Sequence, residues 1–365
     1  MNKRRVLLVS PLVSNVAGGI AKWTVNIIDY YKTLQHIDIE LKPCCNENIQ
    51  NPLANDGLLG RIIKGVNNYI PLIKKVRHEL SGSNVDVVHI CTSASIGLIK
   101  DIAIIRLAKS RNVKCVVHFH FGRIPTIFGR RNWERWLIEK VISGSDKVIV
   151  MDMASYKILK EHGYNHVKYI PNPLSLDTQA FIESDNDIKR VPNKIVFVGQ
   201  MLETKGIFEL AQACEQIDDA KVFFIGPLPN KETEEKLKTL ISTDKLEICG
   251  TMPFGQVIEE MMSASVFALP TYTEGFPNVI IESMACGCPI VTTPVGAIPE
   301  MLDIDGERCG ICVPVKDVNA LKMAIASMLK DSKYAASMGE RAKKRVYNEY
   351  SVQKVWDELA TVWYE

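Results

Sequence analysis

The sequence has no apolar run long enough to cross a membrane. A membrane-spanning helix needs about 20 mostly apolar residues, and no window of eighteen apolar residues occurs in the 365-residue chain. The first residues, Met1-Asn2-Lys3-Arg4-Arg5, are basic, but only a short apolar run follows before Pro11. We therefore expect a first β-strand at this point, with no signal peptide and no transmembrane segment.

The chain also lacks the G-x-G-x-x-G fingerprint of dinucleotide-binding folds. Its absence makes a nicotinamide-dependent oxidoreductase the weaker alternative among enzymes with an α/β fold. Cysteine is not scarce, with ten residues, but most of them lie inside apolar runs, as Cys115 and Cys214 do. We expect buried, reduced thiols there rather than the disulfide framework of a small secreted domain.

Neither sign of charge dominates the whole chain, whose formal net charge is +2, but the two halves differ. Residues 1–170 hold 25 Lys and Arg against 13 Asp and Glu, a net charge of +12. Residues 171–365 hold 19 against 29, a net charge of −10. This asymmetry predicts that the first half faces an anionic surface.

Short β-branched runs alternate with helical patterns along the chain, which predicts two doubly wound α/β domains. In the first half we expect strands at 6–10, 85–90, 113–119 and 148–151, and helices at 20–34, 58–81, 95–111, 131–143 and 153–162. In the second half we expect strands at 195–199, 221–226, 246–250, 266–270, 289–293 and 311–313. Helices are expected there at 204–216, 231–242, 253–263, 277–286, 317–330, 333–348 and 351–363.

The most informative stretch is Glu274-Gly275-Phe276-Pro277-Asn278-Val279-Ile280-Ile281-Glu282. A buried strand is followed by a glycine turn and then by a helix start, which presents backbone N–H groups and a positive dipole end to an anion. One carboxylate precedes the helix and the other lies about one turn inside it. The pattern predicts a site for a phosphorylated, hydroxyl-rich ligand.

This stretch resembles the E-x7-E element of glycosyltransferase family 4, and Glu282 to Val291 is similar to that family's E-[AS]-M-A-x-G-x-P-V-V run. The resemblance implies a GT-B fold: two facing Rossmann-like domains with a cleft between them. It implies an acceptor-binding domain at 1–175 and a nucleotide-sugar donor domain at 190–348. The C-terminal helix, 349–365, would cross back to the first domain.

The resemblance also implies which residues bind the donor. Glu274 would contact the sugar hydroxyls and Glu282 the ribose, with Gly275 and Phe276 between them. The amides of Asn278, Val279 and Ile280 would meet the diphosphate, and backbone groups at the strand end at Gly250 would read the base. Lys205 matches the lysine of the family's G-R-L-x-x-x-K-G pattern, but Gln200 replaces the arginine. Gln200 offers only neutral hydrogen bonds, so we expect weaker donor binding or a replacement cation.

In the first half, Gly18-Gly19 opens the first helix, and by resemblance Gly19 faces the donor phosphate. His118-Phe119-His120-Phe121-Gly122 ends a strand, so both histidines lie on one face. The family resemblance implies a histidine near the donor sugar at this strand end, for which His120 is our first choice and His118 the second. A core histidine is the alternative for either residue. We assign catalytic roles to His120, Lys205 and Glu274.

The segment 123–140 interleaves basic and aromatic residues, which suits an interfacial helix on anionic lipid. Arg123, Arg130, Arg131 and Trp133 are placed with His118 on the acceptor and membrane side, and Ile127, Phe128, Arg135 and Trp136 belong to the same segment. Lys64, Lys74, Lys75 and Arg77 would widen this face. A plain solvated helix with a buried tryptophan stripe is the alternative. No recognised nucleic-acid-binding module is present.

We expect no metal and no other cofactor. Asp185-x-Asp187 and Asp303-x-Asp305 resemble the D-x-D of metal-dependent enzymes but are expected to be solvated turns. Cys286, Cys288, Cys309 and Cys312 could form a zinc site, but the first two replace ordinary small residues of the family run. Cationic groups and helix dipoles would stabilise the departing diphosphate instead.

The sequence thus predicts a cytoplasmic, metal-independent, retaining glycosyltransferase at the inner face of the plasma membrane. It would transfer a hexose-type sugar from UDP or GDP to a glycan or lipid-linked glycan, in surface polysaccharide synthesis. No nucleic-acid partner is expected. A catalytically silent protein that binds nucleotide or glycan on the same fold is the alternative, because of Gln200. A sugar-nucleotide epimerase or an inverting transferase also stays open.

Overall fold

The structure is a computed structural model of the 365-residue chain. It describes residues 3–10, 19–35, 37–45, 58–82, 84–93, 95–184, 188–304 and 306–365, with the backbone alone for 58–67 and 304. No helix in these ranges is long and apolar enough to cross a membrane. The chain divides into two compact units, Met1–Asn172 with Val352–Glu365, and Pro173–Ser351.

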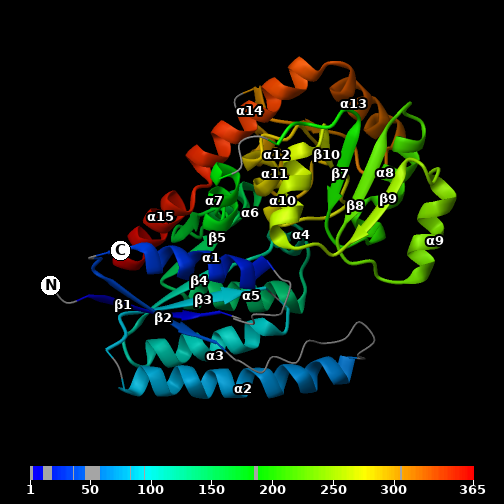
Figure 1. Cartoon of the computed structure of the whole chain (residues 1–365). Helices are drawn as coiled ribbons and strands as arrows, with labels where there is room; N and C mark the ends of the chain where they lie inside the picture. The colour runs from blue at the N-terminus through cyan, green and yellow to red at the C-terminus, as the bar shows by residue number, and fades with distance from the viewer. Residues whose placement is uncertain are drawn as a thin grey trace. The chain divides into compact units, whose positions relative to one another are not determined.

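The N-terminal unit is a parallel α/β sandwich. Its six strands are β1 (Arg4–Val9), β2 (Ile39–Cys44), β3 (Val87–Thr92), β4 (Lys114–Phe119), β5 (Lys147–Val150) and β6 (Val167–Tyr169), in the order β2-β1-β3-β4-β5-β6. The helices are α1 (Gly19–Thr33), α2 (Leu58–Gly82), α3 (Gly97–Lys109), α4 (Ile124–Phe128), α5 (Trp133–Gly144) and α6 (Met153–Glu161). In Figure 1, α2 and α3 cover one face of this sheet and α1 lies on the other.

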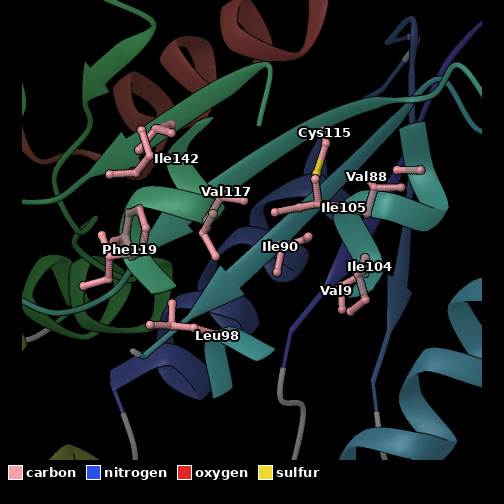
Figure 2. Packing of buried hydrophobic residues seen from close by; sticks show 14 of the residues in the cluster. Val9, Val88, Ile90, Leu98, Ile104, Ile105, Cys115, Val117, Phe119 and Ile142 are labelled. Atoms are coloured by element: carbon pink, nitrogen blue, oxygen red, sulfur yellow. The ribbon is translucent and has the colours of Figure 1, made fainter. Parts of the chain in front are cut away.

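Side-chain alternation along the strands gives this sheet two different faces. Val88 and Ile90 of β3, with Cys115 and Val117 of β4, point into an apolar core against α3 and α5, as Figure 2 shows. The neighbouring positions on the other face include His89 of β3 and His118 of β4, both fully buried. One face of β3 and β4 is therefore an ordinary aliphatic core, and the other buries imidazoles.

The C-terminal unit holds a second parallel sheet. Its strands are β7 (Lys194–Val198), β8 (Lys221–Ile225), β9 (Leu246–Gly250), β10 (Val266–Leu269), β11 (Ile290–Thr292) and β14 (Ile311–Cys312), in the order β14-β11-β10-β7-β8-β9. Its helices are α7 (Leu176–Ser184), the 3-10 helix η1 (Glu203–Lys205), α8 (Ile207–Glu215), α9 (Lys231–Leu240), α10 (Phe254–Ser263), α11 (Asn278–Ala285), α12 (Ile298–Leu302), α13 (Val318–Lys330) and α14 (Ser332–Glu349). This strand order is that of the dinucleotide-binding α/β fold.

The last helix, α15 (Val352–Tyr364), belongs to the N-terminal unit and packs on α1 and β1. Trp363 is fully buried, and its Nε1 donates a hydrogen bond of 2.9 Å to His89 Nδ1. The carboxylate of Glu365 accepts from Lys147 at 2.5 Å and from Lys168 at 3.2 Å. The chain thus returns to its first unit after completing the second.

Several short elements were missed by the sequence analysis. They are the strands β2 and β6, the helices α4, α7 and α12, and a two-residue hairpin of β12 (Asp303–Ile304) with β13 (Glu307–Arg308). The helix predicted at 204–216 is also wrong in one respect, because it is broken at Gly206. That residue has φ of +74°, a left-handed conformation that ends η1 before α8 begins.

Candidate functional site

The strand order of the C-terminal sheet reverses direction between β7 and β10. In open α/β sheets, ligands bind at the carboxyl ends of the strands on either side of such a switch point. The loop after β7 carries Lys205, and the loop after β10 carries Glu274. Backbone bonding joins these two loops, since Tyr272 N–H donates to Thr204 O at 2.8 Å. Two segments far apart in the sequence thus form one wall.

Glycines allow these loops to touch. A Cβ at Gly206 would lie 2.1 Å from Pro270 O, so no other residue fits there without moving the loop after β10. Gly296, with φ of +57°, is packed against the loop of Glu274, where a Cβ would lie 2.3 Å from Glu274 O. Ala297 N–H also donates to Gly275 O at 2.9 Å. The backbones that carry Lys205 and Glu274 are therefore held from both sides.

The two side chains form an ion pair, with Lys205 Nζ 2.5 Å from Glu274 Oε1. Lys205 is 26% exposed and Glu274 is 13% exposed, so the pair is partly shielded and open to solvent on one side. The sequence analysis assigned both residues to the donor site without predicting this bond. Their contact joins two positions that are 69 residues apart.

Helix α11 begins at Asn278, directly after the loop of Glu274. Glu282 lies inside the helix and is 8% exposed. The Ile280 N–H donates to Pro277 O at 3.1 Å, so its predicted contact with a diphosphate would compete with this hydrogen bond. The contacts of the Asn278 and Val279 amides with a diphosphate stay predictions. The N-terminal turn keeps its positive dipole end.

Three other predicted donor residues are placed as follows. The Phe276 side chain is buried and packs edge-on against Tyr350, so a contact with a ligand would have to come from its backbone. Gln200 is exposed, directly after Gly199 at the end of β7. Gly250 ends β9, and its carbonyl accepts from Gly226 N–H at 2.8 Å. Its backbone therefore stabilises a neighbouring loop, a role that the sequence analysis did not foresee.

In the N-terminal unit, the two predicted histidines lie together, with ring centroids 3.9 Å apart. Trp23 of α1 packs on both rings, and His89 of β3 lies beside His118. His118 is fully buried, so its assignment to an acceptor surface is wrong. His120 stands at the end of β4, with partial exposure and a buried Nε2. We call these three histidines with Trp23 the histidine cluster.

Burial dominates the acid–base properties of this cluster. Loss of solvation lowers the pKa of His89 and of His120 to about 3, and it lowers the pKa of His118 well below its usual value. The neighbouring imidazoles oppose protonation further. At neutral pH, His120 is therefore a neutral hydrogen-bonding group. It is poorly suited to carrying a proton through a reaction.

The helical segment at 123–140 is only partly the surface that the sequence predicted. Ile127 and Phe128 are buried in the core of the unit, which corrects their placement on the membrane side. Arg135 is half-buried, lies over the Phe128 ring and binds Glu139 at 2.8 Å. By contrast, Trp133 and Trp136 are 58% and 57% exposed, which excludes the alternative of a buried tryptophan stripe.

Arg123, Arg130 and Arg131 are exposed beside these tryptophans. Arg123 forms an ion pair with Glu134 at 3.3 Å. A shallow pocket of about 480 Å³ lies on this surface, lined by Arg131, Asn132, Trp133, Arg135, Trp136 and Glu139. The surface thus combines cations with exposed indoles.

A family model described as "Glycosyl transferases group 1" matches residues 178–345, and one described as "Glycosyltransferase Family 4" matches residues 45–178. The chain belongs to glycosyltransferase family 4. The resemblance drawn from the E-x7-E stretch is confirmed.

Among the relatives of this family 4 chain is the capsular polysaccharide biosynthesis glycosyltransferase CapM of Staphylococcus aureus. It is 26% identical over 66% of this chain and 67% of its own length. The putative colanic acid biosynthesis glycosyltransferase WcaL of Escherichia coli is 29% identical over 56% of this chain. The match covers 53% of that relative, so the chain spans about half of its length.

Solved structures confirm the GT-B fold of this family 4 chain. Anabaena Alr3699/HepE, in complex with UDP and in complex with UDP-glucose, has a TM-score of 0.69 over 98% of each chain. The sequence identity is 16%, so this likeness concerns the fold alone. The predicted pair of Rossmann-like domains is the architecture that the structure has.

No group of three or more His, Cys, Asp or Glu that could hold a metal ion occurs among the residues the structure describes. Cys286, Cys288 and Cys309 are buried free thiols. The predicted Asp185-x-Asp187 turn and Asp305 lie outside the described residues, as do Gly18 and the side chain of Lys64. The sequence analysis expected Asp303 in a solvated turn. In the structure Asp303 starts the strand β12, and its Oδ2 lies 3.8 Å from Arg308 Nε.

Gly19 begins α1 and is exposed, and a Cβ there would meet no atom within 4 Å. The described residues therefore give no steric reason for a glycine at this position. The sequence analysis missed Gly226 and Gly296, which hold the site loops in place. A Cβ at Gly226 would lie 2.1 Å from Gly199 O. A glycine that directly follows an apolar run was the available signal for Gly226, and nothing local to Gly296 indicated its contact with Glu274.

Proposed function

We propose that this family 4 protein is a retaining glycosyltransferase. It transfers a hexose-type sugar from UDP or GDP to a glycan or lipid-linked glycan, in surface polysaccharide synthesis. The observation that carries the proposal is the meeting of Lys205, Glu274 and the start of α11 at the switch point of the C-terminal sheet. The names of the S. aureus and E. coli relatives support the polysaccharide context, and the UDP-glucose complex of the Anabaena protein supports the donor class.

Catalysis would rest on orientation and electrostatics. Lys205 and the first turn of α11 supply positive charge that a departing diphosphate needs, so we propose that no metal is required. Glu274 would hold sugar hydroxyls and Glu282 the ribose. The N-terminal unit would present the acceptor, with His120 as a neutral hydrogen-bonding group near the sugar. Attack from the face that the diphosphate leaves would retain the configuration of the sugar.

The donor class is tested by thermal unfolding with UDP-, GDP- and ADP-sugars, each with and without Mg²⁺. A ligand that binds the native state raises the unfolding midpoint by mass action. We expect a magnesium-independent rise with one base. Lys205→Ala should abolish this rise, and turnover by Glu282→Ala should fall sharply. Near-normal turnover in both variants would contradict the assignment.

A silent binding protein is the second candidate, because exposed Gln200 replaces the family's arginine. Release of nucleoside diphosphate from the donor, measured with and without a glycan acceptor, separates the two candidates. An enzyme releases nucleoside diphosphate from the donor, either in a single turnover or in a reaction that the acceptor stimulates. A binding protein raises the unfolding midpoint with the donor and releases none.

We further propose that the N-terminal unit binds an anionic membrane surface at the cytoplasmic face. The acids of α3 and α5 are each held in an ion pair: Asp101 with Lys100, Glu134 with Arg123, and Glu139 with Arg135. The exposed side chains there are Arg130, Arg131, Lys140, Trp133 and Trp136, with Ile99 of α3. Cations beside indole rings match the polar–apolar boundary of a bilayer.

A further inference from the structure

The Lys205–Glu274 pair has an unusual setting for a surface ion pair. Exposed pairs contribute little because both side chains move freely, but here both backbones are fixed. Gly206 is packed against Pro270 beside Lys205, and Gly296 is packed against the backbone of Glu274. Their charged atoms are 2.5 Å apart and partly shielded from solvent. The pair is therefore a defined feature of the site before a ligand arrives.

Lys205 is also the only cation of the site loops. These loops follow β7 to β11 and cover 199–206, 226–230, 250–253, 270–277 and 293–297, all within the described part of the chain. Lys205 is the only Lys or Arg among them, because Gln200 is neutral. The two acids are Glu203 and Glu274. A diphosphate bound at this edge would compete with Glu274 for the single lysine.

Resting on the proposed function, we propose that the Lys205–Glu274 pair is a latch that discriminates an intact nucleotide sugar from the free nucleoside diphosphate. On donor binding, Lys205 Nζ moves from the Glu274 carboxylate to the diphosphate oxygens. The released carboxylate accepts hydrogen bonds from the sugar hydroxyls, so no shielded charge is left without partners.

The free nucleoside diphosphate lacks the sugar and cannot satisfy Glu274. When the free nucleoside diphosphate binds, the Glu274 carboxylate loses its lysine partner and lies next to the negative phosphates. The unpaired charge and the charge repulsion both weaken binding of the nucleoside diphosphate. After transfer the ion pair re-forms and the product leaves. The latch therefore uses one carboxylate to favour substrate over product, at loops whose own residues include a single Lys or Arg.

The test is isothermal titration of the nucleoside diphosphate and its nucleotide sugar against Glu274→Gln. This change keeps the shape of the side chain and removes its charge. The latch predicts that the variant binds the nucleoside diphosphate about five- to tenfold more tightly than the wild type. It also predicts that the variant binds the nucleotide sugar no more tightly than the wild type does. The preference for the intact donor should then shrink or reverse.

Glu203→Gln is the matched control. It removes an equal charge from the exposed start of η1, two residues from Lys205, and leaves the ion pair intact. A similar gain in this control would show general charge repulsion and would overturn the latch. Thermal unfolding of each variant without ligand verifies that the fold is kept.

The double variant Lys205→Met with Glu274→Gln completes the thermodynamic cycle. The latch predicts that the gain from Glu274→Gln becomes clearly smaller once Lys205 is gone, because only the repulsion between the carboxylate and the phosphates is then left to relieve. A gain of the same size in that background would overturn it, and so would unchanged or weaker nucleoside diphosphate binding by Glu274→Gln alone. If the wild type bound neither nucleotide, the proposed function itself would fail and the latch with it.

Discussion

The histidine cluster shows how burial changes the chemistry of single residues. His89, His118 and His120 are neutral in the folded protein because desolvation lowers each pKa. In the unfolded chain a histidine has a pKa near 6.5 and takes up a proton below it. The unfolded state therefore binds more protons than the native state between about pH 6.5 and pH 3. Stability is full above pH 6.5 and falls as the pH decreases through that window.

We expect the free energy of unfolding of the N-terminal unit to fall by about 1 kcal/mol per cluster histidine between pH 7.5 and pH 5.5. Denaturant unfolding followed by tryptophan fluorescence measures this unit alone, because all five tryptophans belong to it. His162→Gln, at an exposed histidine outside the cluster, is the control for the substitution itself. A stability that is flat over this pH range would contradict the burial of the cluster.

At the residue scale, the sequence predicted that Lys205 and Glu274 belong to one candidate site, but it did not predict the contact between them. Lys205 and Glu274 each lie in a recognisable local pattern, a strand followed by a glycine turn. Their ion pair forms because β7 and β10 are neighbouring strands. This strand order cannot be predicted from the sequence of either segment alone. Gly296 was missed for the same reason, since its partner is the backbone of a distant loop.

Among the elements, α15 is the one whose position depends most on contacts that its own sequence does not predict. Its apolar stripe predicted a helix, but its place on α1 and β1 rests on particular bonds. Trp363 donates to the buried His89, and Lys114 Nζ donates to Val362 O at 2.6 Å near the helix end. Cations at a helix C-terminus are favoured by the helix dipole.

Trp363→Phe keeps the aromatic ring and removes the donor to His89 Nδ1. A buried acceptor left without its partner costs about 1–3 kcal/mol, so we expect the free energy of unfolding to fall by that amount. Denaturant unfolding followed by circular dichroism is the measurement. The same change at exposed Trp133 should have an effect within ~0.5 kcal/mol. Equal effects at the two positions would argue against a structural role for the hydrogen bond.

Long, strongly periodic elements were predicted well, and short ones were not. Strand β6 has three residues and α12 has five, too few to show a period. Strand β2 contains Pro43 and lies at the edge of its sheet, where the usual apolar run is not needed. The break at Gly206 follows from a tertiary contact with Pro270, which explains why a continuous helix was expected there.

The charge asymmetry of the chain belongs to the whole molecule. The C-terminal unit has the Lys205–Glu274 ion pair at the switch point of its sheet, while the excess of cations lies in the first 170 residues. The alternation of strands and helices predicted two Rossmann-like units, and the family resemblance predicted the return of the last helix. The order of the strands in each sheet could be determined only from the structure, because the order of elements along the chain does not specify which strands become neighbours.

We expect the protein to bind vesicles that contain anionic lipid, with binding that weakens as salt increases. Arg130→Gln with Arg131→Gln should reduce co-sedimentation with such vesicles several-fold, and Trp133→Ala with Trp136→Ala should do so at every salt concentration. The matched control is Lys333→Gln with Lys344→Gln, which removes two exposed cations from the C-terminal unit. Binding that is indifferent to lipid charge would exclude this surface as a membrane contact.

The central claim is that a nucleotide sugar binds at the switch point between β7 and β10. A crystal structure of the protein with the donor that raises its unfolding midpoint tests this claim most directly. We predict diphosphate oxygens within hydrogen-bonding distance of Lys205 Nζ and of the first turn of α11, with sugar hydroxyls at Glu274. A nucleotide bound at any other edge of either sheet, with the Lys205–Glu274 pair intact, would contradict the account.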